Sequence, residues 1–392
     1  MKVLVVAPQP FFSPRGTPFS VYYRTLISTE LGADIDFLTY GQGQDVDIPG
    51  VRFHRGPKLA FLGPVKIGPS AVKLVHDFFL FFLMLRLLVK NRYQVVHAHE
   101  EAVFFALLLK PFFRFQLLYD MHSSLPQQLS NFNFTTFKPL IRLFEWLERM
   151  SLSRSEAIIT ICPDLFDYVN SVLPGNPRNF LIENSILEPV CLARPAAVNP
   201  ETETSSALPG QHFKQKVVYA GTLEHYQGIN ILIDAIPLVI DRLPDAGFIV
   251  VGGTPEQVGL YREQAQHLGV SDKVVFTGRV SQAEARRCTV AADVLVSPRS
   301  SGTNTPLKIY EQLASGIPLV ATAIYSHTQV LSDEVAFLVQ PNGDDMARGI
   351  VAALAPGGDG PQKAQTAQKL YEDEYSRPVY VRKMQQVLES LC

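Results

Sequence analysis

The sequence predicts an α/β protein of GT-B-like layout, built from two doubly wound, Rossmann-like domains. The chain has 392 residues, enough for two domains of ordinary size, and 47% of them are hydrophobic. Short β-branched runs alternate with helical stretches, which is typical of parallel sheets covered by helices on both faces. The alternation occurs in two series along the chain. We therefore expect two sheets that face each other across a cleft with their strand carboxyl ends, the edge at which open α/β sheets bind ligands.

The first series defines an N-terminal domain at residues 1–190. Its opening apolar run is too short for the core of a signal peptide and suits a buried parallel strand. The most apolar segment is Phe78–Val89, but Arg86 lies inside it and further charges flank it, so we expect a buried or membrane-surface helix rather than a membrane span. The expected strands of this series are Val3–Ala7, Ile35–Thr39, Val95–Ala98, Leu117–Tyr119 and Ala157–Ile161.

The second series defines a C-terminal domain at residues 215–375. Between the two series, residues 191–214 are rich in Ala, Pro, Ser, Thr and Glu and are expected to form a linker. Residues 376–392 should form a final helix that begins near Pro378 and packs back on the N-terminal domain. The expected strands of the second series are Lys216–Ala220, Gly247–Val251, Val274–Thr277, Val294–Ser297 and Pro318–Thr322.

Charge and cysteine usage exclude several classes of function. The net charge of −2 gives no global argument for a nucleic-acid partner. The four cysteines show no spacing typical of a metal site, and we interpret them as reduced thiols of a cytoplasmic protein. They are Cys162, Cys191, Cys288 and Cys392.

The richest segment for chemistry is SSGTNTPLKIYEQLASGIPLVAT, residues 300–322. Thr305 suits a helix N-cap and Pro306 a first helical residue, and an unpaired helix N-terminus holds phosphate well. Gly302 would let the loop backbone approach a ligand closely. Lys308 and Glu311, three residues apart, share a helix face. Lys308 could neutralise a diphosphate, with Arg299 as a second cation, and Glu311 could accept hydrogen bonds from a ribose. Alternatively, Lys308 and Glu311 form a surface ion pair and Gly316 caps the helix.

This segment resembles the nucleotide-sugar-binding signature of retaining GT-B glycosyltransferases of family 4, the group 1 glycosyl transferases. YEQLASGIPLVAT matches the second half of that signature, and the resemblance implies that Glu311 binds the ribose hydroxyls. Thr303 replaces the family's first glutamate, which contacts the donor sugar. The resemblance also implies that backbone amides at Asn304, Thr305, Pro306 and Leu307 surround the distal phosphate, although a proline itself has no N–H.

A second resemblance lies in YAGTLEHYQGINILIDAI, residues 219–236, which is similar to a strand–turn–helix motif of the same family. Gly221 takes the turn position. The family's diphosphate-binding arginine and lysine are replaced by Thr222 and Gln227. We expect Lys308 and Arg299 to supply the missing positive charge. A weakened or inactive enzyme would show the same loss. Near the base, the resemblance places Gly278 and Arg279.

The N-terminal half resembles the family more loosely. Gly16 and Arg15 lie in PFFSPRGTPFSVYYRTL, similar to the family's glycine-containing loop near the donor. His122, just past an expected strand, matches the family's catalytic-site histidine. His97 and His99 with Glu100 form a weak metal pattern, and we expect no protein-bound metal and no cofactor.

The resemblance implies a retaining, metal-independent hexosyltransferase that moves a sugar from a nucleotide-diphosphate sugar to a hydroxyl of a saccharide or lipid-linked acceptor, in polysaccharide or glycolipid assembly. Catalysis would fall to His122, Lys308 and Arg299. Two alternatives stay open: a weakened nucleotide-sugar-binding protein, and a GT-B epimerase that uses acids such as Glu100, Glu101 and Glu224.

A membrane contact is the remaining expectation. The segments Phe78–Val89 and Phe104–Leu118 are rich in aromatic and aliphatic residues and are flanked by basic ones. An apolar surface with basic flanks suits peripheral contact with the inner face of a membrane. Alternatively, both segments are core helices. The flanking basic residues are Lys90, Arg92, Lys110 and Arg114.

Overall fold

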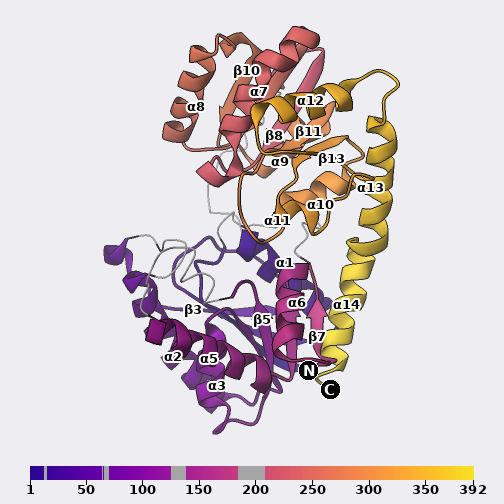
Figure 1. The fold of residues 1–392 in the computed structure, drawn as a ribbon. Helices are drawn as coiled ribbons and strands as arrows, with labels where there is room; N and C mark the ends of the chain where they lie inside the picture. Colours follow the sequence, from indigo (N-terminus) through magenta and orange to yellow (C-terminus); the bar gives the residue numbers. More distant parts are fainter. Residues whose placement is uncertain (13–15, 64, 66–69, 125–137, 184–207) are drawn as a thin grey trace. The chain divides into compact units, whose positions relative to one another are not determined.

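The computed structural model describes residues 1–12, 16–63, 65, 70–124, 138–183 and 208–392 (Figure 1). The chain forms two compact units. Unit 1 comprises Met1–Val198 together with Arg377–Cys392, and unit 2 comprises Asn199–Ser376. Cys191 and most of the expected linker lie outside the described residues.

Unit 1 contains a seven-stranded sheet in the order β3-β2-β1-β4-β5-β6-β7, and all neighbouring strands are parallel. Two of these strands were not expected from the sequence. One is β3, an edge strand in which polar residues alternate with Val51 and Phe53, and the other is β7, which has only three residues. The strands are β1 (Lys2–Ala7), β2 (Asp34–Thr39), β3 (Val51–Arg55), β4 (Val95–His99), β5 (Gln116–Met121), β6 (Ala157–Thr160) and β7 (Asn179–Leu181).

Helices cover both faces of this sheet, because alternate residues of each buried strand point to opposite sides. In β1, Leu4 and Val6 pack into the core under α2, α3, α5 and α6, whereas Val3 and Val5 pack against α1 and α14. The helices are α1 (Gly16–Glu30), η1 (Ala60–Leu62), α2 (Ala71–Lys90), α3 (Ala102–Leu109), α5 (Lys138–Arg154), α6 (Pro163–Val172) and α14 (Arg377–Glu389). The last helix begins beside Pro378 and belongs to unit 1.

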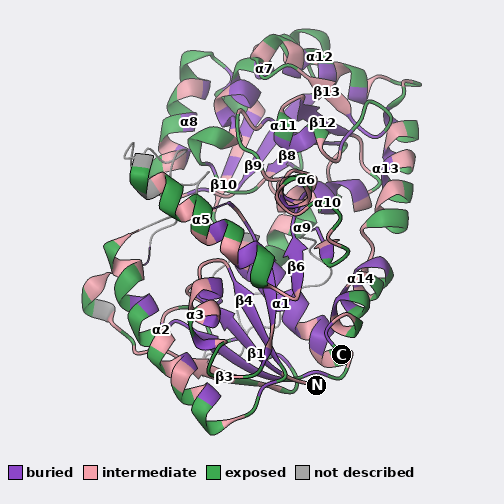
Figure 2. Ribbon diagram, turned by 60° about the horizontal axis from the view of Figure 1, so that its bottom comes forward, coloured by how far each residue is buried: buried purple, intermediate pink, exposed green. Residues whose placement is uncertain are grey.

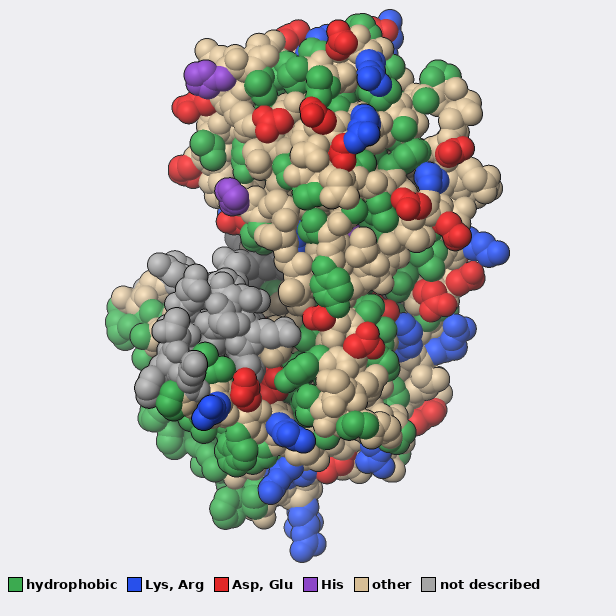
Figure 3. All heavy atoms as spheres, in the orientation of Figure 1, with side chains coloured by type: hydrophobic (Ala, Val, Ile, Leu, Met, Phe, Trp, Pro, Cys, Tyr) green, Lys and Arg blue, Asp and Glu red, His purple; other side chains and the backbone are tan. Residues whose placement is uncertain are grey.

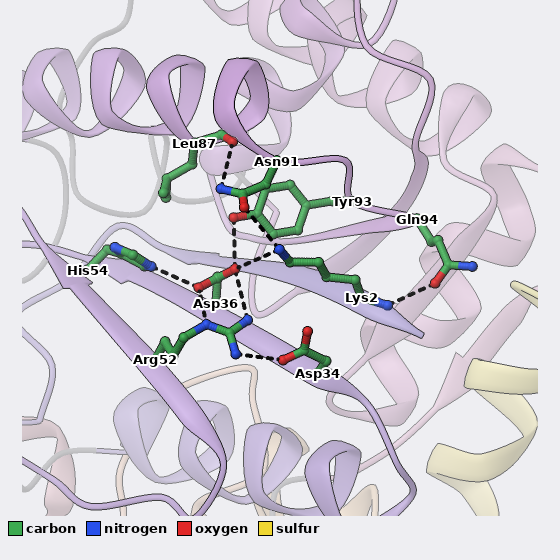
Figure 4. Close-up of polar contacts among 9 residues, drawn as sticks. All are labelled: Lys2, Asp34, Asp36, Arg52, His54, Leu87, Asn91, Tyr93 and Gln94. Carbon is green, nitrogen blue, oxygen red and sulfur yellow. Dashed lines mark hydrogen bonds and ion pairs between the residues drawn. The ribbon is translucent and has the colours of Figure 1, made fainter.

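A polar network fixes the edge of the unit 1 sheet around Asp36, which is 3% exposed (Figure 4). Arg52 from β3 donates to Asp36 through Nε at 2.9 Å, and Tyr93 donates through its hydroxyl at 2.9 Å. His54 Nε2 lies 2.9 Å from the same carboxylate. Burial alone would raise the pKa of Asp36, but these hydrogen bonds outweigh it and lower the pKa to about 2.

Unit 2 contains a six-stranded parallel sheet in the order β10-β9-β8-β11-β12-β13. The short β13 was not expected from the sequence. The strands are β8 (Gln215–Ala220), β9 (Ala246–Val251), β10 (Val274–Gly278), β11 (Val294–Ser297), β12 (Leu319–Thr322) and β13 (Phe337–Val339).

The unit 2 sheet is also covered on both faces. Val217 and Tyr219 of β8 pack into the core formed with α7, α8 and α12, and Val218 packs into the core formed with α9, α10 and α13. Figure 2 shows buried strands and helices with outward exposed residues. The helices are η3 (His225–Gln227), α7 (Ile229–Arg242), α8 (Pro255–His267), η4 (Ser271–Lys273), α9 (Gln282–Val290), α10 (Leu307–Ala314), α11 (Tyr325–Thr328), α12 (Gly343–Leu354) and α13 (Gly360–Glu374). The predicted fold class of two doubly wound parallel-sheet domains is confirmed.

Across the residues that the structure describes, no helix is both long enough and apolar enough to cross a bilayer. The cysteines Cys162, Cys288 and Cys392 are free thiols.

Candidate functional site

The carboxyl edge of the unit 2 sheet is lined by close-packed glycine turns. Gly221 follows β8, Gly252 follows β9 and Gly278 ends β10. The Gly252 amide donates to the Gly278 carbonyl at 2.9 Å. A Cβ on Gly252 would lie 2.0 Å from the Gly221 carbonyl oxygen, so only glycine permits this approach. The turns leave a surface of backbone beside the next strand, β11. Arg279 follows directly and is exposed.

The loop after β11 is organised around Arg299. Its Nε donates to the Ser301 carbonyl at 2.7 Å, and Nη1 donates to the Asn304 carbonyl at 3.1 Å. Gly302 has φ +129°, and a Cβ there would lie 2.2 Å from Arg299 Nη2. Gly302 is therefore required by the packing of Arg299 in addition to any ligand. The guanidinium also lies 5.2 Å from the centre of the Tyr226 ring. Arg299 shapes the loop and keeps its positive charge at the strand edge.

Helix α10 begins one residue later than expected. Pro306 is its N-cap, with extended backbone, and no side chain caps the helix. The prediction of Thr305 as N-cap and Pro306 as first helical residue is therefore wrong, because ψ of 135° at Pro306 takes it out of the helix. The Thr305 hydroxyl is buried and has no hydrogen-bond partner among the described residues. An uncapped N-terminus beginning at Leu307 is well suited to an anion.

Lys308 lies in the first turn of α10 and reaches the turn after β8. Its Nζ donates to Gln227 Oε1 at 3.2 Å and lies 4.1 Å from the centre of the Tyr219 ring. The Tyr219 hydroxyl donates to the Thr222 carbonyl at 2.6 Å. Burial, and then the charge of Arg299, lower the pKa of Lys308 to about 7. The ammonium thus lies beside Gln227, one of the two positions where the resemblance expected a cation.

The other two predicted side chains of this loop lie further out. Glu311 is exposed one turn into α10, and partial burial of its carboxyl raises its pKa. Among the described residues it makes no ion pair with Lys308, which removes the alternative of a simple surface pair. Thr303 is also exposed, and its carbonyl accepts a hydrogen bond from Gln329 Nε2 at 2.5 Å. The chain reverses after α10 through Gly316, which has φ +71°.

His327, which sequence reasoning missed, braces the floor of this region. Its Nε2 lies 3.1 Å from the Ser297 hydroxyl, and its Nδ1 lies 2.8 Å from the Thr322 carbonyl. Burial lowers the pKa of His327 to about 3, so the ring is neutral. It joins the carboxyl ends of β11 and β12. A lone histidine in a four-residue helix gives no sequence signal of such a role.

In unit 1, His122 immediately follows β5 and is buried in a cluster around Asp120. His122 Nε2 lies 3.3 Å from Asp120 Oδ1 and 3.1 Å from His99 Nδ1. His97 Nε2 lies 3.3 Å from Asp120 Oδ2. Burial lowers the pKa of His122. The sequence suggested the position of His122 but not its partner, Asp120.

This cluster also contains Arg24, which argues against a metal ion. Ligand atoms of His97, His99 and Asp120 lie within 4.8 Å of one another. However, Arg24 Nη1 lies 2.7 Å from each Asp120 oxygen. A guanidinium at the carboxylate opposes a second cation. We interpret the cluster as the support of His122.

A second buried group lies at the carboxyl ends of β2 and β4. Lys73 Nζ lies 2.6 Å from Glu101 Oε1 and 3.7 Å from Glu100 Oε2, and the Tyr40 hydroxyl donates to Asp77. Burial raises the pKa of Glu101 to about 8 and that of Asp77 to about 6. Glu100 has a left-handed backbone, φ +48°, which is unusual for a residue with a side chain. The sequence indicated Glu100 and Glu101 but not Lys73 or Asp77.

The remaining predicted residues are not part of these clusters. Gly16 is the first residue of α1, and Arg15 lies outside the described residues. Glu224, in unit 2, is exposed and accepts a hydrogen bond from Gln257 Nε2 at 3.2 Å.

Two family models match consecutive parts of the chain. Residues 28–184 match the Glycosyl transferase 4-like domain, and residues 214–356 match Glycosyl transferases group 1. The chain is 23% identical over 368 residues to a phosphatidylinositol N-acetylglucosaminyltransferase protein of Arabidopsis thaliana, covering 91% of this chain and 74% of that protein.

Solved structures share the fold over the whole chain. Sucrose-phosphate synthase from Thermosynechococcus elongatus matches with a TM-score of 0.75 and 18% identity, covering 100% of this chain and 98% of that one. Anabaena Alr3699/HepE in complex with UDP matches with a TM-score of 0.70 and 16% identity, covering 100% and 99%.

Fold and family matches together define the class of protein as a GT-B-type glycosyltransferase. Within that class, the chain joins a Glycosyl transferase 4-like domain to a Glycosyl transferases group 1 domain. The resemblance seen in the sequence is confirmed at this level.

Proposed function

We propose that the protein transfers a sugar from a nucleotide-diphosphate sugar to a hydroxyl of a glycolipid-type acceptor, with retention of configuration at the sugar. The carrying observation is the uncapped N-terminus of α10 with Lys308 inside it and Arg299 before it. Two supports come from similar proteins: the Anabaena structure contains UDP, and the Arabidopsis relative is named for phosphatidylinositol.

For the donor, the diphosphate would bind against the first turn of α10. The amides of Leu307 and Lys308 and the two cations would oppose its charge. The ribose would bind Glu311, with the base near Gly278 and Arg279. Thr303 would face the donor sugar. Because the protein's own cations lie at this edge, the transfer is proposed to need no metal ion and no cofactor.

In the transfer step, the bond between the sugar carbon and the β-phosphate oxygen breaks. A new bond to the acceptor oxygen forms on the same face. Negative charge grows on the departing diphosphate, and Lys308 and the α10 amides stabilise it more strongly than they stabilise the ground state. The acceptor proton passes to the departing phosphate. His122, held by Asp120, would contact the donor sugar.

Calorimetric titration with UDP, GDP and ADP, combined with donor-hydrolysis and transfer assays, tests the proposal. Binding of one nucleotide and NMR detection of a product with the donor's anomeric configuration are expected. Tight binding without turnover would instead identify a weakened binding protein. Release of an epimerised sugar would identify an epimerase. Failure to bind any of the nucleotides would overturn the donor site.

The relocation of the cations has a separate test. Lys308→Ala is expected to lower kcat more than donor affinity, since charge on the leaving group peaks in the transition state. Adding Thr222→Arg and Gln227→Lys to Lys308→Ala should restore part of the lost rate, because Gln227 already contacts the Lys308 ammonium at 3.2 Å. Wild-type kcat in Lys308→Ala would refute the relocation.

A further inference from the structure

Helix α2 has apolar side chains on two opposite faces. Leu80, Met84 and Leu88 are buried against the sheet. On the other side, Phe78 is 60% exposed and Phe82 is 50% exposed, with their ring centres 4.8 Å apart. A surface helix normally turns charged or polar residues to water. The outer side of α2 therefore has a composition that suits contact with an apolar phase.

The exposed apolar surface continues over the neighbouring elements of unit 1. Figure 3 shows hydrophobic side chains interspersed with Lys and Arg over the α2, α3 and α5 region at the lower left. Phe112, in the turn after α3, is 78% exposed, and Trp146 on α5 is 59% exposed. Large exposed apolar patches of this kind mark interaction sites. We define the apolar face as Leu74, Phe78, Phe82, Val89, Leu108, Phe112, Leu143 and Trp146, all at least 48% exposed.

The charges around the apolar face have one dominant sign. Residues 78–99 and 102–119 contain no Asp or Glu, although the whole chain has a net charge of −2. The same two stretches contain Arg86, Lys90, Arg92, Lys110 and Arg114. This positive charge complements a negatively charged partner and would oppose contact with a second copy of the same face.

A hollow beside Pro111 extends the same end of unit 1. It has a volume of about 500 Å³ and is lined by basic and hydroxyl side chains as well as by Leu107. Lys110 is held within it by Glu156 at 2.6 Å, so Arg154 and Arg178, both exposed, are the cations on its rim. The hollow adds room for polar headgroups next to Phe112.

We propose that the apolar face docks unit 1 on a bilayer containing anionic lipids. Phe78, Phe82, Phe112 and Trp146 enter the boundary between headgroups and acyl chains, and the basic residues attract the lipid phosphates. Aromatic rings with basic flanks favour a lipid surface over a protein partner, since each basic residue near an anionic membrane strengthens binding about fivefold. The inference deepens the proposed function by giving a glycolipid acceptor a surface from which it is taken, but docking itself requires no turnover.

Sedimentation of the full chain with liposomes tests the docking. We expect wild-type protein to pellet with phosphatidylcholine–phosphatidylglycerol vesicles at low salt and much less with phosphatidylcholine alone. The triple variant Phe78→Ser, Phe82→Ser, Phe112→Ser should lose at least tenfold in partition coefficient. Lys90→Gln with Arg92→Gln and Arg114→Gln should lose most of the preference for anionic lipid.

The matched control replaces exposed apolar residues of unit 2, Leu260→Ser with Val290→Ser, which are 61% and 70% exposed. Its liposome binding should equal that of wild type. Wild-type protein that stays in the supernatant with anionic vesicles, or a triple variant that pellets like wild type, would overturn the proposal. So would a lipid-free dimer that the triple variant converts to a monomer, because the face would then join two copies.

Nucleotide titration of the same samples separates this inference from the proposed function. The triple variant should bind UDP, or whichever nucleotide binds wild type, with unchanged affinity, which also shows that it is folded. If no nucleotide binds but the liposome results hold, docking stands and the donor site falls. If nucleotide binds and the vesicles do not, docking falls alone.

Discussion

The Lys308 ammonium combines two properties that seldom occur together on a protein surface. It contacts an aromatic ring and an amide oxygen rather than a carboxylate, and its pKa is lowered to about 7. At neutral pH only part of the free protein therefore carries this charge. A bound diphosphate would favour the charged form and raise the pKa again. Proton uptake and donor binding are thus linked at one residue.

This linkage predicts the pH dependence of UDP affinity. Above pH 7 the free protein has lost the Lys308 proton, so binding must take it back up and affinity should fall as pH rises, by at most about tenfold per pH unit. UDP itself is fully ionised at pH 8, since the second phosphate pKa is about 6. Calorimetry at pH 8 in buffers of different ionisation enthalpy should show uptake approaching one proton. Lys308→Gln should show none, and equal uptake in that variant would assign the proton elsewhere.

Glu311 has a prediction of its own, because its exposed carboxylate is proposed to bind the ribose diol. Glu311→Ala should weaken UDP binding by about 1.5–3 kcal/mol, the range for a hydrogen bond to a charged group. UDP without the ribose hydroxyls should bind wild type equally weakly and should be insensitive to the mutation. Independent, additive losses in this cycle would show that Glu311 acts on another part of the ligand.

Among the elements, the strand–turn–helix units were the most predictable part of the molecule. Long β-branched runs such as Val3–Ala7 gave strands correct to within a few residues, because a strand buried on both faces is apolar throughout. The missed strands β3, β7 and β13 are short or half-exposed, so their stability depends on neighbours that a local pattern does not contain. The same holds for the one-residue error at Pro306, where loop geometry decided the helix start.

The Asp36 network gives a prediction at the scale of elements, since it joins β2 to β3 and to the segment before β4. With a folded pKa of about 2 against 3.8, Asp36 binds fewer protons in the folded state. Its contribution is therefore fully present above pH 3.8 and is lost as pH falls toward 2. The shift limits the contribution to about 2 kcal/mol, and the partly exposed Arg52 reduces it further.

Asp36→Asn should accordingly lower the free energy of unfolding at pH 7 by about 1–2 kcal/mol, with a smaller loss at pH 3. Urea unfolding at both pH values measures it. The matched control is Asp34→Asn, which loses the other Arg52 contact at 2.8 Å but at a site 51% exposed, so its effect should stay below about 1 kcal/mol. A constant loss from pH 7 to pH 3 would show that ionisation of Asp36 is not the cause.

At the scale of the whole molecule, the sequence predicted the two-domain plan and the class of protein better than the details of the site. Motifs around Glu311 and Gly221 are local in sequence, so they can be read directly. The pairing of Lys308 with Gln227 spans 81 positions, and that of Arg24 with Asp120 spans 96. Such contacts follow from strand order, and the sequence alone predicts that two sheets form without stating which residues their edges bring together.

The return of the chain to unit 1 is the whole-molecule feature that can be tested most directly. Helix α14 comes after all of unit 2 in sequence, yet Met384 and Val387 are fully buried in the unit 1 core. Arg377 also contacts Glu30 of α1 at 2.7 Å. Unit 1 should therefore depend on the last residues of the chain for its stability.

Met384→Ala is expected to destabilise unit 1 by about 2–5 kcal/mol, because it leaves a cavity at a fully buried position. Hydrogen exchange followed by mass spectrometry should show faster exchange in β1 and α1, while β8 to β13 exchange as in wild type. Nucleotide affinity should be unchanged, since the proposed donor site lies entirely in unit 2. Arg382→Ala, an exposed position on the same helix, serves as the control and should leave exchange in both units unaltered. Equal acceleration in β1 and β11 would instead mean that the two units unfold as one cooperative body, and α14 would then stabilise the donor site as well.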